Sequence, residues 1–155
     1  MRKILLAMGL SMLASAAVAQ DWVDSTPAQP DRAFYEARNG GKTLMLGCYR
    51  SQQHLSFTLL GGAEPLHASL RGEPALLVWI TLSDGRTGRY AIDTEYLGGG
   101  DNALIGKLML GSEGKQFFAQ GTELSISGSD AGTFFSTGLS GSARAMEDFR
   151  ATCGL

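Results

Sequence analysis

Cys48 and Cys153 are the two cysteines of this chain, and their chemistry can be predicted from where the chain is sent. Residues 1–19 have the features of an export signal, described below, so both thiols are expected in an oxidising compartment. Two cysteines in an exported chain most simply form one disulfide bond. Closing a loop of about 100 residues stabilises a fold by about 4.7 kcal/mol in the chain-entropy model. The alternative is two buried free thiols, and a metal site is disfavoured because the sequence holds no close pair of ligands.

The two histidines, His54 and His67, are the candidate bases for Ser-His-Asp chemistry. His54 opens a predicted strand and His67 lies in a predicted irregular connection, so two surface histidines are the favoured interpretation. The stretch 138–142, Gly-Leu-Ser-Gly-Ser, is similar to a nucleophile elbow. It lacks the second glycine at the required place and no histidine follows it, contrary to the hydrolase order. We therefore predict a non-catalytic protein, with an unrecognised hydrolase as the less favoured alternative.

Two glycine-rich stretches could hold a ligand. Residues 100–107 come close to a phosphate-binding loop, but the spacing is one residue too long and Leu108 replaces the required hydroxyl. Asp101 and Asn102, or Asp130, could ligate calcium, although no EF-hand spacing is present. Ordinary turn chemistry explains both stretches, so no cofactor and no metal are predicted.

Residues 1–19 read as a secretory signal peptide. Arg2 and Lys3 precede an apolar run, and the stretch 17–19, Ala-Val-Ala, fits the cleavage site. The apolar run is shorter than the roughly 20 residues that a spanning helix needs, and no later stretch is long enough. The expected location is therefore periplasmic or secreted, with no membrane span in the mature chain.

The charge of the chain argues against nucleic acid as a partner. The formal net charge is −2, and removing Arg2 and Lys3 with the signal makes the mature chain more acidic. Nucleic-acid binding needs clustered Lys and Arg, and no basic run is present. The 21 glycines and 4 prolines separate short apolar runs, which is typical of a protein built from β-hairpins.

The first half of the mature chain predicts an arm followed by paired strands. Residues 20–31 form a polar arm that Trp22 could anchor, and residues 32–38 could be a strand or a helical turn. Residues 42–49 and 54–60 alternate apolar and polar side chains, which predicts two strands. Their inward residues are expected to be Leu44, Leu46, Cys48, Leu55, Phe57 and Leu59. A short edge strand is expected around Leu66, Ala68 and Leu70.

Residues 75–92 give the clearest hairpin. The run 75–82, Ala-Leu-Leu-Val-Trp-Ile-Thr-Leu, is the most hydrophobic of the mature chain, and β-branched and aromatic residues favour a central strand. Asp84 and Gly85 mark the turn, and residues 86–92 return. Within this run Trp79 is expected to be a core residue rather than a platform for a ligand.

The last part of the chain predicts a helix over strands. Residues 103–110 could be a strand or a short helix, and residues 112–120 a helical turn capped by Ser112 with Phe117 and Phe118 inward. Strands are expected at 123–127 and 133–136, joined by a turn at 128–132. A final helix should begin near Ser140 or Ser142 and end at Gly154. The residues expected to face the sheet are Ala143, Met146, Phe149 and Cys153.

These elements predict a mainly β fold, an antiparallel β-sandwich or curled sheet with a short C-terminal helix packed on it. The expected organisation is a signal peptide at 1–19, an arm with a first strand at 20–38, and a single β-rich domain at 39–155. A bond between Cys48 and Cys153 would tie the terminal helix to the first sheet.

Four stretches carry a family resemblance. They are Trp22, the strand at 44–48 with its polar turn, the hairpin from Trp79 to Tyr90, and the ending from Gly138 to Leu155. Together they resemble the small periplasmic proteins associated with type VI secretion, the TagO-type accessory family. The chain is also similar in kind to the invasion-associated locus B family. Both resemblances imply a periplasmic domain that binds or assists other envelope components, and neither implies an enzyme.

The expected function is therefore that of a non-catalytic exported binding or accessory protein of the bacterial envelope, in the context of secretion. Its partner would be another envelope or secreted protein. The alternative from another class is a periplasmic inhibitor of a wall-degrading enzyme, which would also be a small disulfide-tied β domain.

Overall fold

The computed structural model describes residues 20–27, 29–61, 75–97, 102–128 and 132–155. The predicted signal peptide at 1–19, the edge strand around Leu66, His67 and the calcium candidates Asp101 and Asp130 lie outside these residues, as does the middle of the turn predicted at 128–132. The strands in the described part are β1 (Val23–Asp24), β2 (Arg32–Asn39), β3 (Lys42–Tyr49), β4 (Leu55–Leu60), β5 (Ala75–Leu82), β6 (Thr87–Leu97), β7 (Ala103–Leu108), β8 (Gly121–Gly128) and β9 (Thr133–Gly138).

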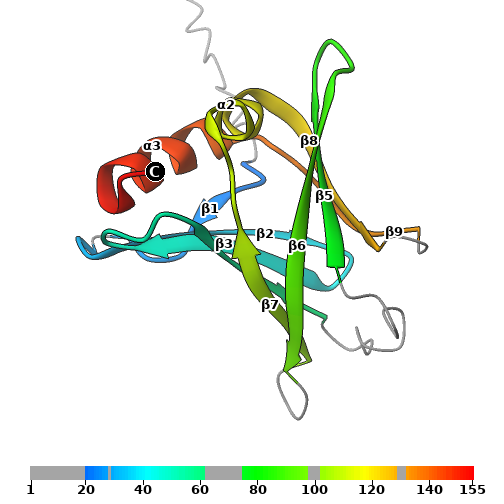
Figure 1. Cartoon of the computed structure of the whole chain (residues 1–155), viewed down its shortest axis with the longest axis horizontal. Coiled ribbons are helices and arrows are strands. Elements are labelled where there is room, and N and C mark those ends of the chain that lie inside the picture. Colours follow the sequence, from blue (N-terminus) through cyan, green and yellow to red (C-terminus); the bar gives the residue numbers. More distant parts are fainter. Residues whose placement is uncertain (1–19, 28, 62–74, 98–101, 129–131) are drawn as a thin grey trace, which may run out of the picture.

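All these strands belong to one antiparallel sheet in the order β1-β2-β3-β4-β7-β6-β5-β8-β9. The sheet curls into a half-barrel, which confirms the predicted curled antiparallel sheet rather than a sandwich of two sheets (Figure 1). The sheet bends at the long strand β6, because Ala75–Leu82 pairs with the first part of β6 and Ala103–Gly106 pairs with its last part.

The inner face of the sheet forms one apolar core. Alternate residues of β3 and β4 point into it, as period-2 patterning requires, and Leu44, Leu46 and Cys48 are fully buried. Leu55, Phe57 and Leu59 are also buried, so the predicted inward faces of both strands are confirmed. Residues 32–39 are a strand rather than a helical turn, and residues 103–108 are likewise a strand.

Two described helices, α2 (Ser112–Gln120) and α3 (Ser142–Cys153), pack in the curve of the sheet (Figure 1). Phe117 and Phe118 of α2 are buried as predicted. The residue that caps α2 is Gly111 and no side chain bonds to the helix end, so the predicted Ser112 cap is wrong. Gly154 ends α3 in the left-handed conformation at φ 75°, as expected for a C-terminal glycine.

The buried face of α3 differs by one position from the prediction. Met146, Phe149 and Cys153 are buried as expected. Ala143 is exposed and Ala145 is fully buried in its place. The reason is that Ala145 lies beside Met146 and one turn before Phe149, at the centre of the apolar stripe, whereas Ala143 lies at its edge.

The β5–β6 hairpin is present as predicted, but Trp79 is not in the core. Val78 and Ile80 point inward, so Trp79 between them points to the outer face, where it is half-buried. Its indole N–H donates to the Ser127 hydroxyl at 3.0 Å, and the Arg89 guanidinium carbon lies 5.7 Å from the ring centroid. The prediction of a buried Trp79 is therefore wrong.

A disulfide bond joins Cys48 of β3 to Cys153 at the end of α3, with a Cα–Cα distance of 6.1 Å. It confirms the predicted pairing and the terminal helix packed on the sheet.

The N-terminal arm closes the curve of the sheet. Trp22 is 1% exposed, and its indole N–H donates to the Gly138 carbonyl at the end of β9. The backbone N–H groups of Asp21 and Trp22 both donate to the Ser140 carbonyl. Because β1 pairs with β2 at the opposite edge of the sheet, the arm links the two edges.

Candidate functional site

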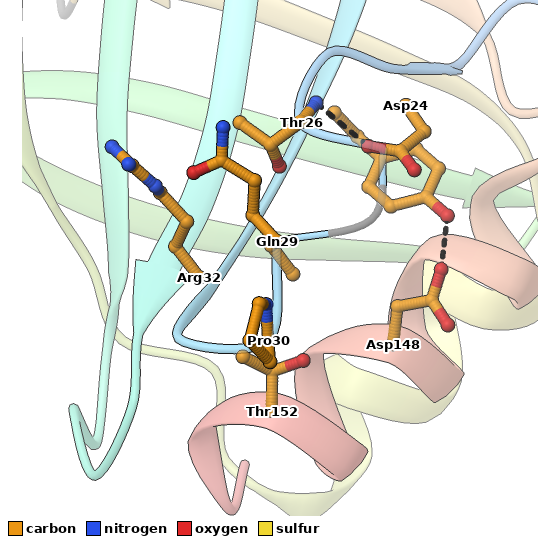
Figure 2. A pocket seen from close by; sticks show the side chains of 9 residues that line it. Asp24, Thr26, Gln29, Pro30, Arg32, Asp148 and Thr152 are labelled. Atoms are coloured by element: carbon orange, nitrogen blue, oxygen red, sulfur yellow. Dashed lines mark hydrogen bonds between the residues drawn. The ribbon is translucent and has the colours of Figure 1, made fainter.

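A polar pocket of about 330 Å³ lies between the arm, strand β2 and helix α3, and we call it the arm pocket (Figure 2). Its charged and hydrogen-bonding side chains come from the arm and β2, which follow one another in the sequence, and from the distant helix α3. The residues that line it are Asp24, Thr26, Gln29, Pro30, Arg32, Ala33, Tyr35, Asp148 and Thr152.

Arg32 supplies the positive charge of the arm pocket. Its side chain is 39% exposed, and its nearest acidic group is Asp31, with 3.7 Å between Nε and Oδ1. That separation allows an ion pair but is too long for a hydrogen bond. The Nε atom itself is buried without a hydrogen-bond partner among the described residues. The guanidinium therefore keeps donor capacity for an acceptor that enters the pocket.

Carboxylates lie on the other side of the arm pocket. One Asp24 oxygen accepts the backbone N–H of Thr26 at 2.8 Å, which folds the arm back on itself. The Tyr35 hydroxyl donates to Asp148 of α3 (Figure 2). Burial, followed by the hydrogen bond and the negative charge of Asp148, raises the pKa of Tyr35 to about 12. The tyrosine is therefore a neutral donor at any physiological pH.

The disulfide holds the walls of the arm pocket together. Ala33, in the β2 wall, is paired with Cys48 in the β-sheet register. Thr152, in the α3 wall, directly precedes Cys153. The Cys48–Cys153 bond thus connects β3, which is paired with the β2 wall, to the end of α3, which forms the other wall. Such a cross-link favours a pocket that is formed before a ligand arrives.

The side chains of the arm pocket are suited to binding a charged ligand. An arginine presents a planar donor fork that matches carboxylate geometry, and carboxylates accept from ammonium or amide N–H groups. Thr26, Tyr35 and Thr152 carry the hydroxyls of the pocket, and no histidine lines it. The arrangement thus offers both signs of charge together with hydrogen-bonding hydroxyls.

A second hollow, the outer cleft, opens between β4, β6 and β7 with a volume of about 750 Å³. It combines acidic, basic and apolar side chains. Its lining residues are Ser56, Phe57, Thr58, Ala91, Asp93, Thr94, Glu95, Ile105, Gly106, Lys107 and Met109.

The residues considered for catalysis do not meet in either hollow. His54 lies 2.6 Å from the Gln52 amide nitrogen, at the start of β4. The Ser140 carbonyl accepts from the arm, and its N–H donates to Asp21 at 3.0 Å, so this part of the 138–142 stretch fastens the arm to α3. Gly106 and Lys107 of the near phosphate loop lie on β7, and a search of the described residues finds no cluster of three metal-ligating side chains.

Sequence reasoning missed the residues of the arm pocket. It assigned Asp24 to the polar arm at 20–31, placed Arg32 at the start of a strand or helical turn at 32–38, and left Asp148 off the helix face that was expected to meet the sheet. The available signal was indirect: an arm anchored by Trp22 must run beside the helix that Cys153 ties down. The contact between Tyr35 and Asp148 joins residues 113 positions apart, and no local pattern predicts it.

In comparisons with known proteins, no family model, curated protein or solved structure matches this chain. Across the described residues, neither helix has the length and apolar character needed to cross a membrane.

Proposed function

We propose that this protein is a non-catalytic binding or accessory protein of the bacterial envelope, exported to the periplasm or secreted. Its binding site is the arm pocket, and its ligand is a zwitterionic group such as an amino acid or the end of a peptide. In the context of secretion, that group would belong to another envelope or secreted component.

The observation that carries this proposal is that Arg32, whose Nε is buried without a hydrogen-bond partner among the described residues, lines the same pocket as Asp24 and Asp148. A ligand with a carboxylate alone would meet one cation and two acidic side chains, so an anion without a donor is disfavoured. A zwitterion satisfies both sides, with its carboxylate on Arg32 and its ammonium near the acidic residues. The volume of about 330 Å³ is at the small end of ligand sites, which admits a group of this size.

Export is supported by two independent features. The signal-like sequence at 1–19 would direct the chain out of the cytoplasm. The Cys48–Cys153 disulfide persists in an oxidising compartment such as the periplasm. The resemblance to TagO-type and invasion-associated locus B proteins favours an accessory role there.

The experiment is an NMR titration of ¹⁵N-labelled mature protein with amino acids and with dipeptides that have free termini. We expect shifts confined to the amides of Thr26, Gln29, Ala33 and Thr152. Capping either end of the dipeptide, by acetylation or amidation, should weaken binding because one charge is then lost.

Arg32→Gln should abolish these shifts while leaving the fold intact. The matched control is Arg38→Gln, which removes another arginine of β2 that is paired with Glu36 at 2.7 Å, outside the pocket. The proposed function would be contradicted if none of the amino acids and dipeptides produced shifts at millimolar concentration. It would also be contradicted if Arg32→Gln left the shifts unchanged.

The β5–β6 hairpin favours a second candidate, an inhibitor of a wall-degrading enzyme. The hairpin projects beyond α2 (Figure 1). Asp84 braces its turn by accepting the Arg86 N–H at 3.0 Å and the Arg86 Nε–H at 2.8 Å. The Arg86 guanidinium carbon also lies 5.8 Å from the Phe117 ring centroid, which ties the turn to α2. A rigid projecting loop is suited to entering the cleft of an enzyme.

Inhibition of a purified muramidase acting on isolated cell wall tests this candidate. Asp84→Ala should weaken inhibition because it loosens the turn, and Glu36→Ala should not, although it also breaks a surface ion pair. The inhibitor role is excluded for that enzyme class if the wild-type protein leaves its rate unchanged.

A further inference from the structure

Strand β6 changes neighbours along its length. On the side of β5 it is paired from Thr87 to Asp93, and on the side of β7 the register runs only from Thr94 to Leu97. On the N-terminal side of Thr94 the two strands separate, and β7 leads away toward α2 (Figure 1). The outer cleft lies at this separation, with Ala91 and Asp93 in its wall.

The backbone of β6 directs hydrogen-bonding groups into the outer cleft. Near the turn, the Leu82 N–H donates to the Arg86 carbonyl, so the even-numbered residues of β6 face β5. In an antiparallel strand the backbone groups alternate between the two sides, and the odd-numbered residues therefore face away from β5. The position of the Asp93 carbonyl beside Gly106 of β7 agrees with this direction. Arg89 and Ala91 thus present N–H and C=O groups where no described strand pairs with them.

The side chains around the outer cleft define what could pair there. Ile105 is half-buried and Met109 is 64% exposed, which gives an apolar contact on the β7 side. Asp93 and Glu95 are exposed, and no ion pair engages them within the described residues. Lys107 is the one basic lining residue against these two acids.

We propose that the outer cleft binds a short extended segment of another polypeptide, which adds as a strand to residues 89–93 of β6. The backbone of β6 supplies the hydrogen bonds, as in other complexes formed by strand addition. The segment carries apolar side chains that contact Ile105 and Met109, and at least one basic side chain that meets Asp93 or Glu95. It is short because β7 occupies the same side of β6 from Thr94 onward.

A second copy of this chain fits the cleft less well. Antiparallel pairing of two β6 strands around Ala91 would set Thr87 of one copy opposite Glu95 of the other. Ile105 of β7 already occupies that position beside Glu95. A free chain segment can end or turn away at this point, whereas the continuous strand of a folded domain cannot.

The test uses the mature protein and the acetylated, amidated peptide Val-Lys-Val-Lys-Val, followed by NMR titration. Shifts at the amides of Arg89, Ala91 and Asp93 are expected. The same peptide with alternate amides N-methylated cannot complete the ladder and should lose binding. The capped termini keep the peptide from acting as a zwitterion, so failure here is distinguishable from failure of the arm pocket.

Two protein variants separate the backbone from the charge. Ala91→Pro removes an N–H that faces the cleft rather than β5, a position where an edge strand tolerates proline. Asp93→Lys should weaken binding by about tenfold, equivalent to about 1.4 kcal/mol, and remains informative if the proline variant does not fold. The matched control is Glu123→Lys, which makes the same charge change on β8.

Three results of the peptide titrations would overturn the proposal. They are equal binding of the N-methylated peptide, shifts outside the cleft that Asp93→Lys does not affect, and absence of peptide binding. Dimerisation in sedimentation experiments that is abolished by Asp93→Lys would instead assign the edge to a second copy and also contradict it.

Discussion

Tyr35 connects the sheet to the terminal helix through one hydroxyl. Because this hydroxyl ionises at high pH, the stability of the fold should depend on pH in the alkaline range. Burial and the hydrogen bond to Asp148 raise the pKa of Tyr35 to about 12, from about 10 for an ordinary tyrosine. A raised pKa in the folded state means that the stabilisation is complete below pH 10 and is lost as the pH rises toward 12. Within this window the free energy of unfolding should fall by about 1.4 kcal/mol per pH unit at most.

Urea unfolding at successive pH values measures this dependence, and Tyr35→Phe is the matched variant. The phenylalanine keeps the ring contact with Phe149, whose centroid lies 5.7 Å away, and deletes the hydroxyl. We expect the variant to lose roughly 1–3 kcal/mol at neutral pH and to have a shallower alkaline decline than the wild type. Parallel declines in the two proteins would show that other groups cause the effect.

Trp79 is a residue whose stability effect follows from which face of the sheet it occupies. Because its side chain is half-buried on the outer face, Trp79→Ala should cost less than the roughly 3–5 kcal/mol typical of a buried large aromatic. Phe149→Ala, at a fully buried position, should cost that full amount. Chemical denaturation of both variants makes the comparison, and equal losses would place Trp79 energetically in the core.

At the scale of elements, the disulfide decides how firmly α3 is held. Replacing Cys48 and Cys153 together by serine should lower the free energy of unfolding by about 2–5 kcal/mol. The loss should appear first in α3, because the sheet keeps its ladder hydrogen bonds without the cross-link. Hydrogen exchange should therefore accelerate at the amides of Met146 and Phe149 more than at those of Phe57 in β4.

Reduction of the wild-type protein provides an independent check that introduces no new side chain. It should reproduce the pattern of the double variant. Unchanged protection of α3 in both cases would mean that its apolar face alone holds the helix in place.

Where apolar and polar side chains alternate, the sequence predicts both the strand and its inward face, whereas a continuous apolar run predicts the strand alone. Leu44, Leu46 and Cys48 recur at every second position and are all buried, so their strand and its inward face are evident. The run at 75–82 is apolar throughout, and its length and turn predict a strand without indicating which side chains face the core. The orientation of Trp79 is set by pairing with Arg89 and Ser125, which no local pattern encodes.

The arm pocket lay beyond prediction for a related reason. Arg32 and Asp148 line the same pocket only because helix α3 packs across β2 and β3. The disulfide was predictable from two cysteines and a signal-like sequence at 1–19, but the side chains that it brings together depend on the register between strand and helix. Polar residues in an arm or on a helix face have no periodicity that marks them as partners.

At the scale of the whole molecule, the arm joins the two edges of one curled sheet. Asn39, at the end of β2, donates its side-chain N–H to the Ser136 carbonyl of β9 at 2.7 Å. At another point the Trp22 indole N–H donates to the Gly138 carbonyl at 3.1 Å. Both edges are therefore covered where the arm lies, which limits unwanted pairing with other chains. By contrast, residues 89–93 of β6 have no described strand paired with them on the side of the outer cleft.

Trp22→Phe tests whether this closure stabilises the molecule. The variant keeps an aromatic ring near Phe118, whose centroid lies 5.2 Å from the indole, and leaves the Gly138 carbonyl without its donor. We expect a loss of about 1–3 kcal/mol, together with faster hydrogen exchange in β9 than in β4. The matched control is Trp79→Phe, which removes an indole N–H bonded to the Ser127 hydroxyl at 3.0 Å on the outer face. That variant should cost less because water can replace the lost donor at a half-buried site, and equal losses would contradict a special role of the arm.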